Sequence, residues 1–174
     1  MPQTTTQKSV ARLYRDVERL ITEDPERYLL DTFPLIPLDG PAPRRFYSAL
    51  QRQVQDIGYD FRRTTNPGGF GCTDHTMRRI EVKRGLPPHQ TLDTTVHELT
   101  HAMLPTDPWP WMLRRIGEIR AESVAFVVCD VLGLPSDSFS LGYIAHWADA
   151  DMGFIHECVR YTVSKTANQI LAGI

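Results

Sequence analysis

The chain has 174 residues, 41% of them hydrophobic, and its 19 basic and 21 acidic side chains leave a net charge of −2. The apolar content is too high for a disordered chain, and the near-neutral charge argues against the broad basic field of nonspecific nucleic-acid binding. No apolar stretch reaches the roughly 18–20 residues of a membrane span, and the polar start lacks a signal-peptide apolar region, so we expect a soluble, cytoplasmic protein with one domain over residues 1–174.

The first third of the chain is predicted to be mostly helical. Apolar residues at three- and four-residue intervals predict helices over Gln7–Thr22 and Pro43–Ile57. Prolines spread over Leu29–Pro43 exclude a long regular element and predict an extended connection between the two helices. We therefore treat residues 1–58 as an N-terminal helical extension.

A small sheet and then further helices are predicted for residues 59–174. Alternating polar and apolar residues predict strands over Tyr59–Thr64 and Arg79–Lys83, with an irregular strand over Phe70–His75 between them. Four helices are predicted after the sheet, over Thr91–Leu104, Arg114–Leu132, Ser140–Ala150 and Gly153–Ala172. The predicted fold class is α+β, with helices on one side of a small sheet.

The sequence His-Glu-Leu-Thr-His at residues 97–101 lies inside the third predicted helix. A separation of four residues places His97 and His101 on one helical face, where both imidazoles can bind one divalent ion, with Zn²⁺ the expected metal. Glu98 projects about 100° away from His97, where a base for a metal-activated water would stand. The alternative interpretation is an exposed helix with two surface histidines and a glutamate.

A catalytic zinc site needs a third protein ligand, and the next predicted helix offers Glu118 and Glu122. Glu122 is followed by an almost wholly apolar run, where a carboxylate is costly unless it is paired or bound to a metal. Glu118 lies one turn earlier, where an ion pair with a nearby arginine can explain it. We predict Glu122 as the third ligand, with Glu118 as the alternative. The three scattered cysteines form no Cys-x-x-Cys pair and predict neither a disulfide framework nor a thiolate zinc site.

Two further features are compatible with hydrolysis of a peptide. Tyr143 and His146 lie one turn apart on a predicted helix, and either could donate a hydrogen bond to an oxyanion, with ordinary packing as the alternative. The exposed edge of the strand Arg79–Lys83, just before the motif helix, could pair with an extended substrate.

These motifs together resemble a known group of proteins. The order of His-Glu-Leu-Thr-His, Ala-Glu-Ser-Val-Ala-Phe-Val-Val-Cys, Tyr-Ile-Ala-His-Trp-Ala and a long final helix is similar to the zincin-like metallopeptidases of antirestriction (ArdC-type) and polyvalent proteins. The resemblance covers about Tyr59–Leu171, and it is more distant to ImmA/IrrE-type peptidases. It implies a zincin-like domain in which His97, His101 and Glu122 bind one Zn²⁺ and Glu98 is the catalytic base.

The expected function is therefore that of a zinc metallopeptidase that hydrolyses a peptide bond in a protein substrate, such as a phage, mobile-element or regulatory protein. Relatives of the antirestriction type often carry an N-terminal single-stranded-DNA-binding domain, and residues 1–58 are too few and too proline-broken to match it. We expect no direct binding of nucleic acid and none of a membrane. The alternative is a non-catalytic, metal-stabilised module that binds a repressor, a restriction factor or DNA.

Overall fold

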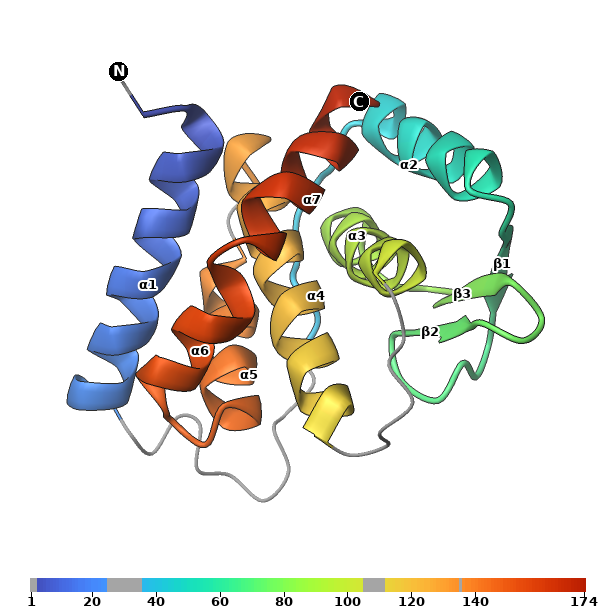
Figure 1. Cartoon of the computed structure of the whole chain (residues 1–174). Coiled ribbons are helices and arrows are strands. Elements are labelled where there is room, and N and C mark those ends of the chain that lie inside the picture. Colours follow the sequence, from blue (N-terminus) through green and yellow to red (C-terminus); the bar gives the residue numbers. More distant parts are fainter. Residues whose placement is uncertain (1–2, 25–35, 105–111, 135) are drawn as a thin grey trace.

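The computed structural model describes residues 3–24, 36–104, 112–134 and 136–174. Within these ranges the chain forms seven helices and a three-stranded sheet, and the predicted α+β class is confirmed (Figure 1). In chain order the elements are α1 (Thr5–Glu23), α2 (Arg44–Asp56), β1 (Asp60–Thr64), β2 (Gly71–Asp74), β3 (Arg79–Lys83), α3 (Pro88–Met103), α4 (Met112–Val131), α5 (Asp137–Trp147), α6 (Met152–Val159) and α7 (Thr162–Ala172). None of the described helices is long and apolar enough to cross a membrane.

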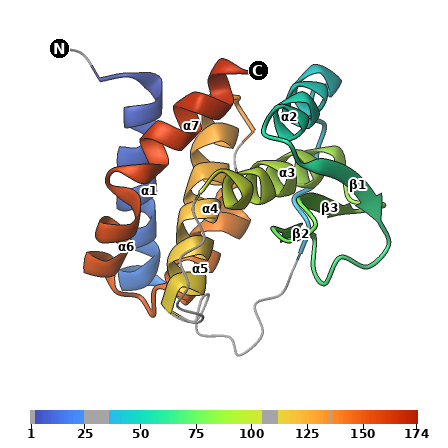
Figure 2. The same ribbon diagram turned by 45° about the vertical axis from the view of Figure 1, so that its right-hand side comes forward.

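The helix α3 lies at the centre of the molecule, between a helical bundle and the sheet. Figures 1 and 2 show α1, α4, α5, α6 and α7 on one side of α3, and the strands and α2 on the other. Leu92, Val96 and Leu99 of α3 are fully buried and join the core that α4 supplies with an apolar run from Val124 to Cys129. This position makes α3 a rigid support for the polar side chains that it also carries.

Local sequence signals explain where several of the helices begin. Thr4 and Gln7 form a reciprocal capping box at the start of α1, with the Gln7 amide donating to Thr4 Oγ1 and the Thr4 amide donating to Gln7 Oε1. Pro88 occupies the first turn of α3, where its missing N–H leaves no donor unpaired. Asp151 caps α6 by accepting a hydrogen bond from the Phe154 amide.

The strand order of the sheet is β1–β3–β2, with β1 parallel and β2 antiparallel to β3. The expectation that the strand Arg79–Lys83 offers an exposed edge is wrong, because β3 is the central strand and is paired on both sides. Ile80 and Val82 face the core as predicted, and both are fully buried. Thr73 on β2 is the register partner of Ile80, so its side chain also lies on the α3 face of the sheet.

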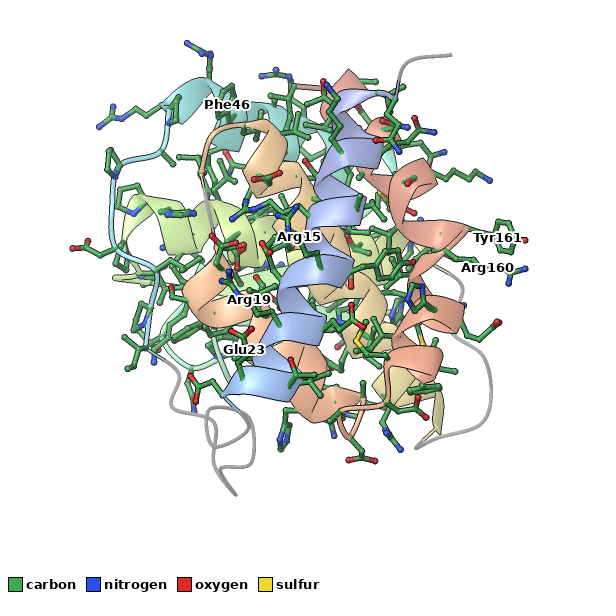
Figure 3. The ribbon with its side chains drawn as sticks, turned by 90° about the vertical axis from the view of Figure 1, so that its left-hand side faces the viewer. Arg15, Arg19, Glu23, Phe46, Arg160 and Tyr161 are labelled. Atoms are coloured by element: carbon green, nitrogen blue, oxygen red, sulfur yellow. The ribbon has the colours of Figure 1, made fainter. Side chains whose placement is uncertain are left out.

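The last predicted helix, Gly153–Ala172, is two helices in the structure. Arg160 and Tyr161 form a turn between α6 and α7, and the helix resumes at Thr162. The apolar spacing continues through the break, with Val159 and Val163 four residues apart and both buried, so the sequence contains no signal for it. Figure 3 shows Arg160 and Tyr161 projecting outward from this junction, and Tyr161 is 74% exposed. The predicted extended connection over Leu29–Pro43 falls partly outside the described residues, and its described end, residues 36–43, contains no helix or strand.

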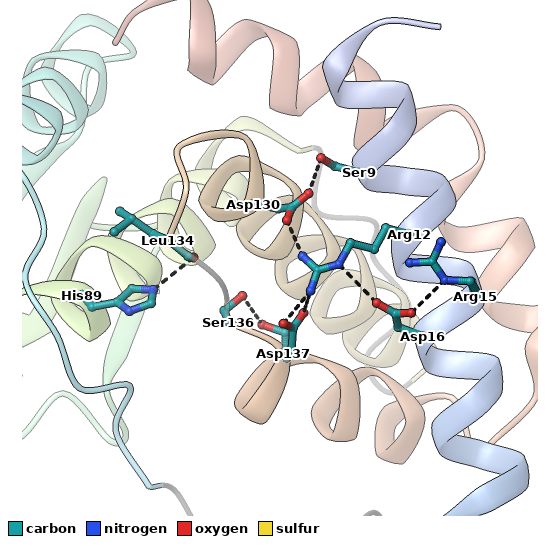
Figure 4. Close-up of polar contacts among 10 residues, drawn as sticks. Ser9, Arg12, Arg15, Asp16, His89, Asp130, Leu134, Ser136 and Asp137 are labelled. Atoms are coloured by element: carbon teal, nitrogen blue, oxygen red, sulfur yellow. Dashed lines mark hydrogen bonds and ion pairs between the residues drawn. The ribbon is translucent and has the colours of Figure 1, made fainter.

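An ion-pair network fixes α1 against the ends of α4 and α5. The Arg12 guanidinium contacts Asp16 on its own helix, Asp130 on α4 and Asp137 on α5 (Figure 4). Both carboxylate oxygens of Asp137 lie 2.6 Å from Arg12 Nη2, and Ser9 donates to Asp130. Because residues 1–58 supply α1 to the bundle and α2 to the contacts with α3 and β1, this extension forms part of the same packed structure.

Candidate metal and catalytic site

One face of α3 lines a cavity of about 450 Å³. The residues on this face recur at intervals of one and three, as expected for neighbours on a helix, and they are Gln90, Asp93, Thr94, His97, Glu98 and His101. The other walls come from residues 67–70, from β2 and the residue after it, and from α4 and α5. The sequence motif therefore faces a cavity, and the interpretation as an exposed surface helix is wrong for these side chains: Glu98 is only 6% exposed.

Three potential ligands converge at the end of this face. His97 Nε2 and His101 Nε2 are 3.1 Å apart, and Glu118 Oε2 lies 3.4 Å from the first and 3.9 Å from the second. One donor atom from each of His97, His101 and Glu118 lies within 4.8 Å of the other two. Donors about 2.0–2.1 Å from a tetrahedral zinc ion are separated by roughly 3.3 Å, so this spacing is close to what the ion needs.

Glu122, the predicted third ligand, is placed on the other side of His97. Its Oε2 lies 2.9 Å from His97 Nδ1, whereas His101 and Glu118 approach Nε2 of the same ring. The prediction that this buried carboxylate needs a partner is confirmed, since Glu122 is 1% exposed and pairs with His97. The geometry nevertheless favours the alternative, Glu118, as the third ligand, and gives Glu122 the task of orienting the His97 ring.

Glu98 lies beside the ligand cluster and is fixed by β2. The hydroxyl of Thr73 lies 2.8 Å from Glu98 Oε2 and 2.9 Å from the Glu98 carbonyl oxygen. A Cβ atom at Gly71 would come within 2.6 Å of Glu98 Oε1 and 2.7 Å of Thr94 Cγ2, so only glycine leaves room for the carboxylate at this position. Burial raises the pKa of Glu98 above its ordinary value.

The predicted oxyanion donors, Tyr143 and His146, are separated by the structure. Tyr143 on α5 lines the cavity, and burial followed by the nearby charge of Glu118 raises the pKa of its hydroxyl. Its ring stacks on Phe139, which also lines the cavity. His146 is exposed, contacts the Trp147 ring, and is not among the described residues that line the cavity.

The electrostatics of the cluster favour a bound cation. Burial acts to lower the pKa of His97, but hydrogen bonds with Glu118 and Glu122 raise it well above the ordinary value. Burial and the charge on His97 lower the pKa of His101 to about 4, so at neutral pH this imidazole is uncharged, the form that binds metals. Burial acts to raise the pKa of Glu118, but its hydrogen bond to His97 lowers it overall. A protonated His97 places a positive charge beside the carboxylates of Glu118 and Glu122. A divalent cation bound by the same donor atoms would supply positive charge at this position.

Several residues of the cavity were not identified from the sequence. Asp93 is fully buried, and its carboxylate oxygens accept from Gln90 Nε2 at 3.2 Å and from Cys129 Sγ at 3.7 Å. Arg114 and His75 also line the cavity, from α4 and from the residue after β2. The cysteines are all free, and none belongs to the ligand cluster. Thr73 and His75 precede the motif by more than 20 residues, so the spacing in the sequence does not indicate that they lie close to it in the fold.

Comparison of the chain with protein-family models, curated proteins and solved structures finds no significant match. The resemblance to zincin-like metallopeptidases therefore remains a prediction from the motif residues.

Proposed function

We propose that the protein is a zinc-dependent peptidase with His97, His101 and Glu118 as metal ligands and Glu98 as the catalytic base. The observation that carries this proposal is the convergence of three ligand atoms, within 4.8 Å of one another, at the wall of a 450 Å³ cavity. Three protein ligands with adjoining open space are typical of catalytic zinc sites, whereas structural sites have four protein ligands.

When bound, a zinc ion would act as a Lewis acid, polarising the scissile carbonyl and activating water. The protein's own groups have separate roles. Glu122 holds His97 through Nδ1, which directs Nε2 toward the ligand cluster. Glu98 accepts a proton from the attacking water and returns it to the amine that leaves when the C–N bond breaks. The raised pKa of Glu98 suits this exchange, because a carboxylate of ordinary pKa is a weak base at neutral pH.

The edge strand β2 is the candidate platform for an extended peptide. It lies at the outside of the sheet order, and Gly71, Cys72 and Thr73 line the cavity. A substrate that pairs with this edge would pass directly in front of Glu98, since Thr73 and Glu98 are hydrogen-bonded. The strand proposed to pair with a substrate is therefore β2, in place of Arg79–Lys83.

The alternative, a metal-stabilised module without catalysis, has less support. In such a module a protein side chain would occupy the fourth zinc position, and a carboxylate beside the metal would not need to be accessible to a substrate. Among the described residues the ligand cluster contains three residues, and Glu98 lines the cavity. The protein substrate and a cytoplasmic location remain predictions.

The decisive experiment combines metal analysis with cleavage. We expect purified wild-type protein to contain one zinc per chain by elemental analysis, and to cleave members of a proteome-derived peptide library followed by mass spectrometry. Glu98→Gln should retain zinc and lose about 10²–10⁴-fold in rate, the usual worth of a general base. Glu157→Gln, an exposed glutamate on α6, is the matched control and should be as active as wild type. Absence of zinc, or full activity of Glu98→Gln, would overturn the proposal.

A further inference from the structure

His75 lies in the cavity wall and has no role in the proposed site. It follows the last residue of β2 and lines the same cavity as His97, His101 and Glu98. It is near enough to the ligand cluster that its electrostatic interaction with His101 acts to lower the pKa of that residue. Its position at the end of the edge strand places it beside the path that a paired peptide would follow.

The ring of His75 contacts Tyr59. The Tyr59 hydroxyl lies 2.9 Å from His75 Nδ1, and the two rings meet edge to face with centroids 6.2 Å apart. Tyr59 precedes β1 and belongs to the opposite edge of the sheet, so this contact joins the two ends of the sheet order. The Tyr59 hydroxyl can donate to Nδ1 or accept from it, and donation leaves the ring proton of a neutral His75 on Nε2.

Tyr59 is fixed in turn by Arg78, which has a strained backbone. Arg78 has a φ of 47°, in the left-handed region that most side chains avoid. Its guanidinium lies 5.1 Å from the Tyr59 ring centroid and donates to the carbonyls of Ile57 and Gly58 at 2.7 and 3.0 Å. Gly58, directly before Tyr59, has a φ of 77°, in the left-handed region that favours glycine. Strain of this kind persists where the surrounding contacts fix it, and it often serves a site.

We propose that His75 is a catalytic residue that donates a hydrogen bond from Nε2 to the substrate oxygen on which negative charge develops, with Tyr59 and Arg78 as positioning residues. The inference rests on the proposed peptidase function. In this arrangement Arg78 packs on the Tyr59 ring, the Tyr59 hydroxyl donates to His75 Nδ1, and Nε2 carries the ring proton as the donor to the substrate. This assigns the oxyanion-donor role to the residue after β2 in place of the predicted candidates on α5.

The test uses zinc-loaded protein and two inhibitors that separate metal binding from oxyanion binding. Acetohydroxamate chelates zinc directly, whereas N-phosphoryl-Leu-Trp presents a tetrahedral anion like the one formed during hydrolysis. For His75→Ala we expect unchanged zinc content, an unchanged Kd for acetohydroxamate, at least 10-fold weaker binding of the phosphoryl dipeptide, and a kcat lower by about 10²-fold, as for loss of one oxyanion donor.

Variants at the neighbouring positions test how His75 acts. His75→Gln keeps an N–H donor near Nε2 and should recover part of the lost kcat. Tyr59→Phe keeps the ring and should lower kcat by about 3- to 10-fold, the worth of one neutral hydrogen bond. His156→Ala is the matched control, because His156 is also an exposed histidine in contact with a tyrosine ring, that of Tyr14, and lies outside the cavity lining.

The outcomes separate the two proposals. A wild-type protein that contains zinc and cleaves peptides, together with a His75→Ala variant of equal kcat and equal affinity for the phosphoryl dipeptide, would overturn the role of His75 alone. Loss of zinc or of acetohydroxamate binding in His75→Ala would also overturn it, because it would make His75 part of the metal site. A wild-type protein without zinc or cleavage would refute the proposed function and this inference with it.

Discussion

The carboxylate of Glu122 lies 2.9 Å from Nδ1 of His97, on the side of the ring opposite the nitrogen that faces Glu118. The two carboxylates are one helical turn apart on α4, and they contact the two nitrogens of the same imidazole. One helix thus supplies both a candidate ligand and the residue that orients another ligand. Carboxylates that orient a metal-bound histidine in this way raise its basicity and fix its tautomer.

This arrangement predicts a rank order for metal affinity. Glu118→Gln removes a charged ligand and should weaken zinc binding by more than 100-fold, whereas Glu122→Gln removes an orienting group and should weaken it about 10- to 100-fold. Competition against a chromophoric chelator measures both affinities on folded protein. The reverse order, with Glu122→Gln the more damaging change, would restore Glu122 as the third ligand.

Asp93 should make the stability of the metal-free protein depend on pH. Burial, followed by the negative charge of Glu122, raises the pKa of Asp93 from 3.8 to about 8. Between these values the folded state holds a proton that the unfolded state has lost. The free energy of unfolding therefore falls as pH rises, by up to about 1.4 kcal/mol per pH unit from this group.

The variant Asp93→Asn isolates this effect, since an amide keeps the shape of the neutral acid and does not titrate. Urea unfolding of both chelator-treated proteins at pH 5, 6, 7 and 8 gives the measurement. Titrating groups that do not interact with Asp93 cancel in the difference, whereas Glu122 and His97 interact with Asp93, and their response to the substitution is part of the measured effect. We expect wild type to lose stability relative to Asp93→Asn as pH rises, and parallel pH profiles would refute the assignment.

The parts of the site that depend on local spacing were predictable from the sequence. The four-residue separation of His97 and His101 determines that they share a helical face, and the structure places both at the cavity. The choice between Glu118 and Glu122 was not predictable in the same way. Burial correctly indicated that Glu122 needs a polar partner, but both carboxylates approach His97, and only the rotation of α4 about its axis decides which nitrogen each one meets.

The order of the strands in the sheet also could not be predicted from the sequence. Three successive short strands suggest a meander, yet β3 inserts between β1 and β2 and pairs in parallel with β1. This order moves the free edge from β3 to β2, and with it Gly71 and Thr73 reach Glu98. Pairing of this kind is set by contacts distant in sequence, such as burial of Ile80 and Val82 against α3, and no local pattern reports it.

Arg12 should contribute to stability more than its partial exposure suggests. Its guanidinium contacts three aspartates from three helices, and its loss leaves those carboxylates facing one another. We expect Arg12→Met to lower the free energy of unfolding by about 2 kcal/mol, within the range for hydrogen bonds to charged groups. Arg15→Met is the control on the same helix, because Arg15 is 70% exposed and its ion pair with Asp16 is worth less than about 1 kcal/mol. Equal effects of the two changes, measured by urea unfolding, would refute the prediction.

Gly71 connects the fold to the chemistry, because its missing side chain creates the space that Glu98 occupies. A Cβ atom at Gly71 would lie 2.7 Å from Glu98 Cγ, so Gly71→Ala should displace the carboxylate and lower kcat by at least about 10-fold. Gly69→Ala in the adjoining segment is the matched control, since its Cβ would meet its nearest neighbour, the Gly71 carbonyl oxygen, at an ordinary 3.8 Å. Zinc content should be unchanged in both variants, because neither glycine contacts the ligand cluster. A Gly71→Ala protein as active as Gly69→Ala would show that Glu98 does not need this position to act as the base.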